Sequence, residues 1–222
     1  MLYNPPQEKK GYSITLFTDS MNSWIIPWVQ QIKDILSPFH NVTTCYRKDD
    51  LSEGDFNFLL GCTKILEKEF LCLHRHNLVV HESDLPLGKG WSPLSWQIVQ
   101  GASEIPVVLF ETGEQLDGGP IFIKDRIVFQ GNELLPEIRI KQGLKTIELV
   151  LKFLNQWPDI TPLMQSGEDS YYRKRTEKDD RLDIKKSIAE QFNHLRIIDN
   201  QKYPAWFEIR GKKFKILIYD YK

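Results

Sequence analysis

The stretch NLVVHESDLPLGKGWSPLSWQIVQGASEIPVVLFETGEQLDGGPIFIK, residues 77–124, decides the fold and the candidate site of this chain. An apolar strand ends at His81 and leads into a loop rich in proline and glycine. A short helix and a second apolar strand follow, and then a turn in which Asp117 precedes two glycines. Side chains at the ends of neighbouring strands meet at one edge of a sheet, so we expect His81 and Asp117 to line one cleft.

Strands alternate with helices along the first two thirds of the chain. Runs of β-branched and aromatic residues predict the strands, and apolar residues at helical spacing predict the helices. The expected strands are 13–18, 41–46, 55–60, 77–81, 105–110 and 121–123, the last paired with 126–129; the expected helices are 24–35, 64–71, 93–100 and 137–156. This alternation predicts an α/β fold with a Rossmann-like, mostly parallel sheet, in which ligands bind beyond the carboxyl ends of the strands.

The C-terminal part of the chain follows a different pattern. A charged tract at 167–186 and a short helix near 188–195 precede alternating residues around Gly211, which predict a β-hairpin. We therefore expect a core domain over residues 1–130 and a small C-terminal extension of helix and hairpin over residues 131–222.

Composition excludes several classes of protein. The 222 residues include 29 basic and 30 acidic ones, a balance that argues against a general nucleic-acid or membrane-surface binder. Three cysteines, Cys45, Cys62 and Cys72, form an odd set without paired spacing, which indicates reduced thiols. The N-terminal residues contain no apolar signal region and no run is long enough to span a bilayer, so we expect a cytoplasmic protein. The oligomeric state stays open, with a homodimer among the options.

His81 and Asp117 each have a common structural explanation. A histidine at the end of an apolar strand is more often structural than catalytic, and aspartate is frequent in turns before glycine. A histidine and a carboxylate in one cleft, with no obvious nucleophilic serine or cysteine, instead suit the management of protons during a reaction.

Three further patterns are weaker. Cys72, His74 and His76 form a cluster that invites a metal site. The two histidines can chelate an ion from one strand face, but no clear third ligand joins them, and a polar surface cluster before a strand is the commoner explanation. The glycines around Lys89 lack the spacing of a phosphate-binding loop. The basic residues at 171–175 are nearly cancelled by acids at 177–183, which favours a solvated loop or a clamp for a small anionic ligand over a nucleic-acid patch.

Three separated motifs resemble those of the formyltransferases that use 10-formyltetrahydrofolate. They are HESDLPLGKGWSP from His81, IPVVLF from Ile105 and LDGGPI from Leu116. In that family a histidine precedes Ser-x-Leu-Pro, and Leu-Asp-x-Gly follows at a fixed distance, so that His81 and Asp117 match the family's histidine and aspartate. The family includes methionyl-tRNA formyltransferase and the sugar N-formyltransferases. The tail beyond Tyr172 resembles the short tail of the sugar branch, of the type that acts in pseudaminic-acid pathways.

The family places an asparagine two residues before its histidine, and this chain has Val79 there. Asn77 lies one pleat further back, about 6–7 Å away. Asn77, Ser83 or Lys89 are candidates to replace the missing group, and it is equally open that no residue does.

The resemblance implies a set of roles. His81 would stabilise negative charge on the formyl oxygen, Asp117 would orient His81 and relay a proton, and Asn77 is the candidate third member. The core domain would bind the folate, and the extension would complete the acceptor site. The implied folate-binding residues are Leu60, Gly61, Cys62, Phe110, Thr112 and Gly113; those implied for a nucleotide-linked amino sugar are Lys89, Trp91, Arg173, Arg175 and Arg196. No metal is implied.

Two alternatives remain at this stage. The valine at position 79 motivates a folate-binding or regulatory protein of the same fold that has lost activity. A hydrolytic relative would instead release formate without any acceptor amine.

Overall fold

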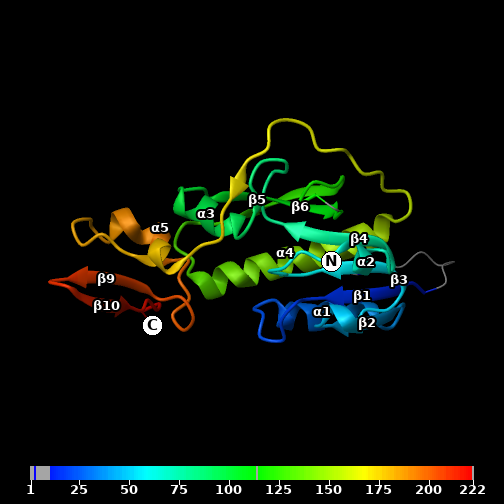
Figure 1. Ribbon diagram of the computed structural model, residues 1–222, viewed down its shortest axis with the longest axis horizontal. Coiled ribbons are helices and arrows are strands. Elements are labelled where there is room, and N and C mark those ends of the chain that lie inside the picture. The colour runs from blue at the N-terminus through cyan, green and yellow to red at the C-terminus, as the bar shows by residue number, and fades with distance from the viewer. Residues whose placement is uncertain (1–2, 4–10, 114, 222) are drawn as a thin grey trace.

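A computed structural model describes residue 3, residues 11–113 and residues 115–221 of the chain. Its centre is a six-stranded sheet in the order β2-β1-β3-β4-β6-β7 (Figure 1). The strands are β1 (Ser13–Phe17), β2 (Asn41–Cys45), β3 (Gly54–Leu59), β4 (His74–His81), β6 (Glu104–Glu111) and β7 (Ile121–Val128). β1 to β4 pair in parallel. β6 pairs antiparallel with β4, and β7 pairs antiparallel with β6. The expected mostly parallel α/β sheet is confirmed.

One face of this sheet carries the main hydrophobic core. The helices α1 (Ile26–Leu36), α3 (Pro93–Val99) and α4 (Leu135–Gln156) supply side chains to the same buried cluster as the strands. The opposite face is covered by smaller clusters, to which the short helix α2 (Lys68–Leu71) and the loop after β4 contribute. Side chains alternate between the two faces along a strand, so Leu78 enters the main core while His81 lies on the opposite face.

The β6–β7 region corrects one expectation. We expected a short strand at 121–123 paired with 126–129, but β7 runs unbroken from Ile121 to Val128 and pairs with β6 throughout. Ile121 lies beyond a register shift in the pairing and belongs to a cluster on the opposite face. Ile123 and Ile127 both enter the main core, so the two-residue alternation continues across the charged residues between them. Asp125 makes no turn there, because its Oδ2 accepts a hydrogen bond from Lys145 of α4 at 2.9 Å.

β4 begins earlier than expected and absorbs the histidine cluster. His74 is buried, and its Nε2 shares a hydrogen bond with Thr15 Oγ1 at 2.9 Å. His76 Nδ1 lies 3.0 Å from Glu111 Oε2 on the neighbouring strand. These contacts explain both histidines as strand residues with protein partners, rather than as a polar surface cluster.

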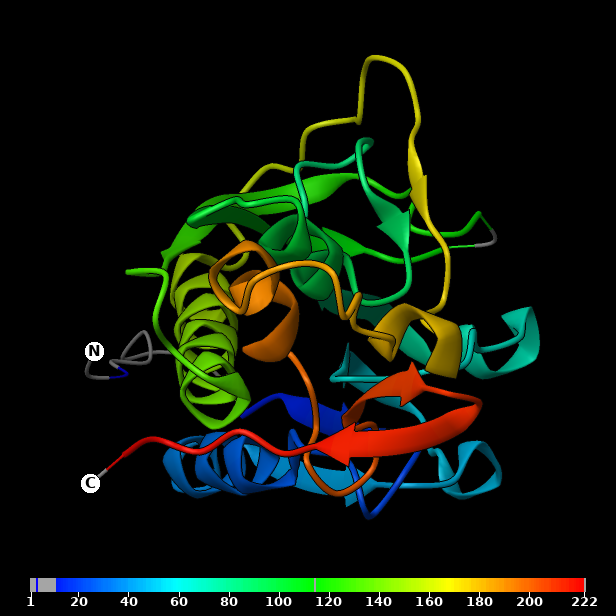
Figure 2. The same cartoon turned by 90° about the vertical axis from the view of Figure 1, so that its left-hand side faces the viewer.

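The C-terminal extension has a small core of its own. Its elements are β8 (Tyr171–Tyr172), two 3-10 turns (Glu177–Asp180 and Ala189–Gln191), α5 (Phe192–Leu195), β9 (Ala205–Ile209) and β10 (Lys212–Ile216). Leu182, Leu195, Ile198 and Ala205 form its core. The hairpin β9–β10 lies beyond the end of the sheet toward which β4 points (Figure 1), and Figure 2 shows it in front of α1. The hairpin turning near Gly211 is thus confirmed.

α4 packs with the sheet rather than with the hairpin, because its apolar face lies in the main core. The buried members of the small separate cluster lie from Leu182 onward, and the division of the chain after residue 130 stays a prediction. Among the described residues no helix is long and apolar enough to cross a membrane.

Gly143 of α4 fixes the distance between α4 and α1. A Cβ at this position would overlap the indole of Trp28. We therefore expect Gly143→Ala to lower the free energy of unfolding by about 1–3 kcal/mol, the usual cost of overpacking. Urea denaturation measures the change. Leu144→Ala is the control, since Leu144 is 52% exposed and its truncation should cost under about 1 kcal/mol. Equal losses in the two variants would contradict the tight helix contact.

Candidate active site

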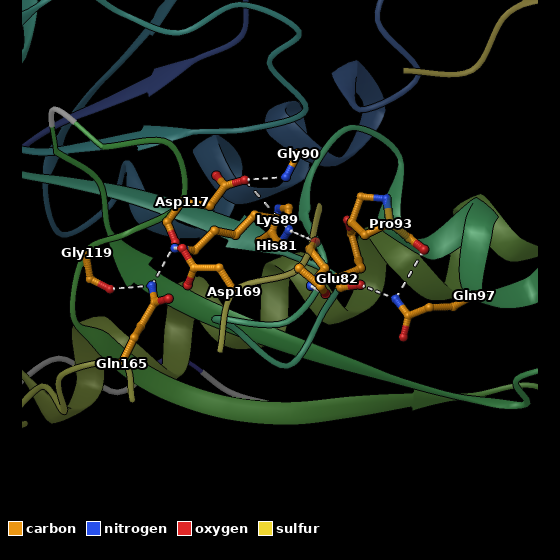
Figure 3. A network of polar contacts seen from close by, with 12 residues as sticks. His81, Glu82, Lys89, Gly90, Pro93, Gln97, Asp117, Gly119, Gln165 and Asp169 are labelled. Atoms are coloured by element: carbon orange, nitrogen blue, oxygen red, sulfur yellow. Dashed lines mark hydrogen bonds and ion pairs between the residues drawn. The ribbon is translucent and has the colours of Figure 1, made fainter. Parts of the chain in front are cut away.

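His81 ends β4 at the edge of the sheet and is only 6% exposed. Its Nε2 lies 3.0 Å from the carbonyl oxygen of Gly88, which can only accept a hydrogen bond. Neutral His81 therefore carries its proton on Nε2. The ring meets the Phe110 ring edge-on, with 6.3 Å between centroids, and this contact limits rotation of the imidazole. Figure 3 shows His81 beside Lys89 and Asp117.

Asp117 reaches the same place from the loop between β6 and β7. Its backbone is left-handed, with φ of 47°, a conformation that aspartate tolerates better than most residues. Its Oδ2 accepts a hydrogen bond from the Gly90 amide at 2.8 Å and lies 3.9 Å from His81 Nε2. The structure thus brings His81 and Asp117 together, as expected, but not for the expected reason: β6 is antiparallel to β4 and ends opposite Leu78, and the loop after β6 carries Asp117 to His81.

A short strand, β5 (Lys89–Gly90), connects the two side chains. The carbonyl of Gly88, just before β5, binds His81, and the amide of Gly90, within β5, binds Asp117. β5 pairs in parallel with β8 of the C-terminal extension. A Cβ on Gly90 would overlap the carbonyl oxygen of Tyr172, so only glycine permits this close approach.

Residues 163–172, which we call the strap, bind both the loop after β4 and the loop between β6 and β7. Gln165 Nε2 donates to the carbonyl oxygens of Asp117 and Gly119, at 2.8 and 2.7 Å. Ser170 Oγ accepts from the Gly88 amide at 2.8 Å. Lys89 is 6% exposed, and its Nζ donates to Asp169 Oδ2 at 2.8 Å (Figure 3). The sequence analysis missed the strap, since a polar segment without periodicity gives no sign of what it contacts.

A pocket of about 260 Å³ lies over the carboxyl ends of the strands. His81 and Asp117 line it, together with Leu60, Gly61, Cys62, Trp91, Thr112 and Gly113 from the expected sets. Apolar side chains such as Leu59, Leu66 and Val79 alternate there with backbone groups of the loops at 60–64 and 112–113. Apolar walls with a few polar backbone groups suit a flat heterocyclic ring.

Burial raises the pKa of the Cys62 thiol to about 12, so this pocket cysteine is no thiolate nucleophile near neutral pH. Among the residues that the structure describes, no group of three histidines, cysteines or carboxylates is arranged to hold a metal ion.

Other expected site residues lie elsewhere. Phe110 is fully buried and does not line the pocket. Asn77 is buried one pleat behind the pocket, where its Nδ2 donates to the Leu71 carbonyl at 2.8 Å and its Oδ1 accepts from Asn57 at 3.2 Å. These bonds occupy the amide that was the candidate third catalytic group. Val79, which stands nearer to His81, contributes only apolar wall.

The three arginines proposed for a phosphate clamp are separated. Arg196 is 2% exposed and donates to the Glu133 carbonyl and to Glu133 Oε2, both at 2.8 Å. Arg175 lies 2.5 Å from Asp180 Oδ1 and is largely buried. Arg173 is exposed, is paired with Asp179, and places its guanidinium 4.9 Å from the centre of the Trp96 ring. Of the three, only Arg173 is accessible to a ligand.

Glu82 is a pocket residue that the sequence analysis did not select. It follows His81 directly and lines the pocket together with Gln142 and Thr146 of α4. Gln142 Nε2 donates to its Oε1 at 2.5 Å. Burial raises the pKa of the Glu82 carboxyl above its usual value, against the lowering effects of the Gln142 bond and of His81. Its place directly after the strand-end histidine was the only signal in the sequence.

Residues 45–138 match the family model described as formyl transferase. The match includes both His81 and Asp117. A methionyl-tRNA formyltransferase of Thermus thermophilus is 30% identical over 156 residues, which are 69% of this chain and 50% of that relative. The chain thus spans about half the length of the curated relatives that it matches most strongly.

Solved structures share the fold over nearly the whole chain. A methionyl-tRNA formyltransferase from Clostridium thermocellum superposes with a TM-score of 0.80 at 21% identity, covering 95% of this chain and 93% of that one. A 4-N formyltransferase from Francisella tularensis gives 0.74 at 17% identity, covering 95% and 98%. HypX from Aquifex aeolicus, in complex with tetrahydrofolic acid, gives 0.76 at 17%, covering 94% and 38%. The fold is therefore that of the formyltransferases.

The Arg196–Glu133 pair predicts a stability effect rather than a binding effect. Removing one partner of a buried ion pair costs about 3–5 kcal/mol. Lys141 would still pair with Glu133 in the variant, so we expect a loss at the lower end of this range. We expect Arg196→Ala to show this loss in urea denaturation. Arg126→Ala, which removes an exposed pair with Glu104, should cost under about 1 kcal/mol. A fully stable Arg196→Ala protein with weakened ligand binding would instead restore Arg196 as a ligand contact.

Proposed function

We propose that this protein transfers the formyl group of 10-formyltetrahydrofolate to the primary amine of a nucleotide-linked amino sugar. The observation that carries the formyl-transfer part is the meeting of His81 and Asp117, at 3.9 Å, in one pocket, since both residues belong to the segment that matches the formyl transferase model. The tetrahydrofolic acid bound by HypX, a structural neighbour, supports a folate as donor.

The pocket residues have the properties that this reaction needs. Attack of an amine on the formyl carbon places negative charge on the formyl oxygen. The N–H of neutral His81 is bound to the Gly88 carbonyl, but a protonated ring gains a second N–H on Nδ1, and this donor would stabilise the charge in a site that largely excludes water. Asp117 lies 3.9 Å from His81 Nε2, and a shift of about 1 Å would bring it within hydrogen-bond distance, where it would orient the ring and accept a proton passed on by His81. The folate ring would lie against the loops at 60–64 and 112–113.

The choice of acceptor rests on charge. A tRNA acceptor needs an extended basic surface. This chain has 29 basic and 30 acidic residues, and some basic side chains of the extension pair with neighbouring acids, as Arg173 with Asp179 and Arg175 with Asp180. The match to the Francisella 4-N formyltransferase covers 98% of that chain, but the match to the Clostridium methionyl-tRNA formyltransferase covers 93%, so length does not separate the two acceptors. The charge balance favours a small acceptor, although the curated relatives are named for methionyl-tRNA.

The two-residue centre predicts the effect of removing either side chain. His81→Ala and Asp117→Ala should each slow formyl transfer at least about a hundredfold, the scale for loss of a proton-transfer or oxyanion-stabilising group. The rate of tetrahydrofolate release in the presence of amine measures the change, and donor affinity should change far less. Near-normal turnover of either variant would rule out the centre. Tetrahydrofolate release by the unmodified protein without amine would indicate a hydrolase, and donor binding without turnover a binding protein.

The acceptor class has a separate test. A ligand that binds only the native state raises the unfolding temperature. We expect UDP, but not tRNA, to do so, and Arg173→Ala to raise the KM for the sugar nucleotide more than the KM for the folate. Lys174→Ala, at an exposed neighbouring position, is the control. Tight, salt-sensitive binding of tRNA without protection by UDP would overturn the amino-sugar acceptor and leave formyl transfer standing.

A further inference from the structure

Glu82 lines the pocket from the face of the sheet opposite to the face on which His81 lies. β4 ends at His81, and side chains alternate between the two faces of a strand. His81 therefore belongs to the face of the smaller clusters, and the Glu82 carboxylate lies on the face covered by α4, where Gln142 binds it. The pocket is lined by both residues, so it passes over the end of β4 from one face to the other.

The environment of Glu82 contains no matching cation. Gln142, its hydrogen-bond donor, is a neutral amide, and no lysine or arginine among the described residues forms an ion pair with Glu82. Other shielded carboxylates of this chain have stronger donors. Buried Glu133 is held by Arg196 and Lys141, and half-buried Glu111 by the backbone amide of Asn77 and by His76. The charged form of a carboxylate in a pocket without a cation is unfavourable, so the group favours either a proton or a ligand that supplies a cation.

The pocket wall around Glu82 narrows the choice of ligand group. Val80 and Pro93 also line the pocket with apolar surface, and Val80 packs against the main core on the face of α4. The backbone of Glu82 is fixed as well, since its carbonyl accepts a hydrogen bond from Gln97 Nε2 at 2.7 Å. The Glu82 carboxylate is thus a fixed hydrogen-bond acceptor. A positively charged donor can reach it through the part of the pocket beside His81.

We propose that Glu82 binds the ammonium group of the acceptor and takes the proton that this group must lose before it attacks. The inference rests on the proposed function and names the residue that prepares the acceptor. An amine in water near neutral pH is mostly protonated and has no free electron pair. Burial raises the pKa of Glu82, which lowers the free-energy cost of proton transfer from the ammonium group.

The protons of the acceptor balance in three steps. Glu82 takes one proton from R–NH₃⁺, and the freed electron pair forms the bond from nitrogen to the formyl carbon. The bond from the formyl carbon to N10 of the folate then breaks, and N10 receives a second amine proton by way of His81 and Asp117. The third proton stays on the formamide nitrogen, and Glu82 returns its proton to water.

The test compares an amine with a hydroxyl in binding and follows turnover in parallel. The probes are a UDP-linked 4-amino-4,6-dideoxyhexose and the UDP-linked 6-deoxyhexose with a hydroxyl at that carbon. We expect the unmodified protein to bind the amine at least about tenfold more tightly, as a charge-assisted hydrogen bond provides. In Glu82→Gln this preference should fall to about twofold or less, and kcat/KM for the amine should drop about a hundredfold with unchanged folate affinity. Glu82→Asp should recover part of both.

Glu111→Gln is the matched control. It also replaces a half-buried carboxylate with a raised pKa, at the end of β6, but its partners are protein groups, so the preference for amine over hydroxyl should survive. Retention of that preference and of turnover in Glu82→Gln would overturn the role of Glu82. So would absence of the preference in the unmodified protein, or binding of neither probe. Amine preference that depends on Glu82, without any formyl transfer, would sustain the ammonium site and contradict the proposed function alone.

Discussion

The hydrogen bond from the Gly90 amide to the Asp117 carboxylate is the constraint on which the site depends. It joins a loop after β4 to a loop after β6, and it leaves Asp117 3.9 Å from His81. The left-handed backbone at Asp117 has a local energetic cost, which the surrounding contacts must offset. Gln165 does so by holding the Asp117 and Gly119 carbonyls, and β8 does so by pairing with β5. The C-terminal extension therefore supports the catalytic geometry.

The two faces of the sheet divide the chemistry between them. His81 and Asp117 lie on the face of the sheet that carries the smaller hydrophobic clusters. The apolar walls and backbone groups of the pocket there would suit a folate ring. Glu82 reaches the face of α4, where Gln142 holds it. In the proposed reaction, the end of β4 would separate a region for the donor from a region for the acceptor, and both would belong to one pocket. His81 and the residue that follows it would then serve two substrates, because successive side chains of an extended chain point to opposite faces.

Local periodicity predicted the sheet, the long helix and the terminal hairpin, because those elements are set by apolar residues at fixed spacing. The meeting of His81 and Asp117 was expected from strand ends at one edge, but the structure achieves it differently: β6 runs antiparallel to β4 and ends opposite Leu78, and the loop after β6 carries Asp117 to His81. The continuous β7 was missed since Asp125 and Arg126 resemble a turn until Lys145 of α4 is seen beside them. The strap and the burial of Arg196 depend on polar contacts between distant residues, such as Lys89 with Asp169, that leave no pattern in the sequence.

The central claim is that the pocket over the end of β4 holds the formyl donor against His81. A crystal structure of the protein with 5-formyltetrahydrofolate, a stable isomer of the donor, tests it most directly. The account predicts the pterin against the loops at 60–64 and 112–113, with the formyl-bearing end directed toward His81 and within about 4 Å of its ring, close to hydrogen-bond reach. A folate bound elsewhere, or bound in this pocket with its formyl end directed away from His81 and Asp117, would contradict it.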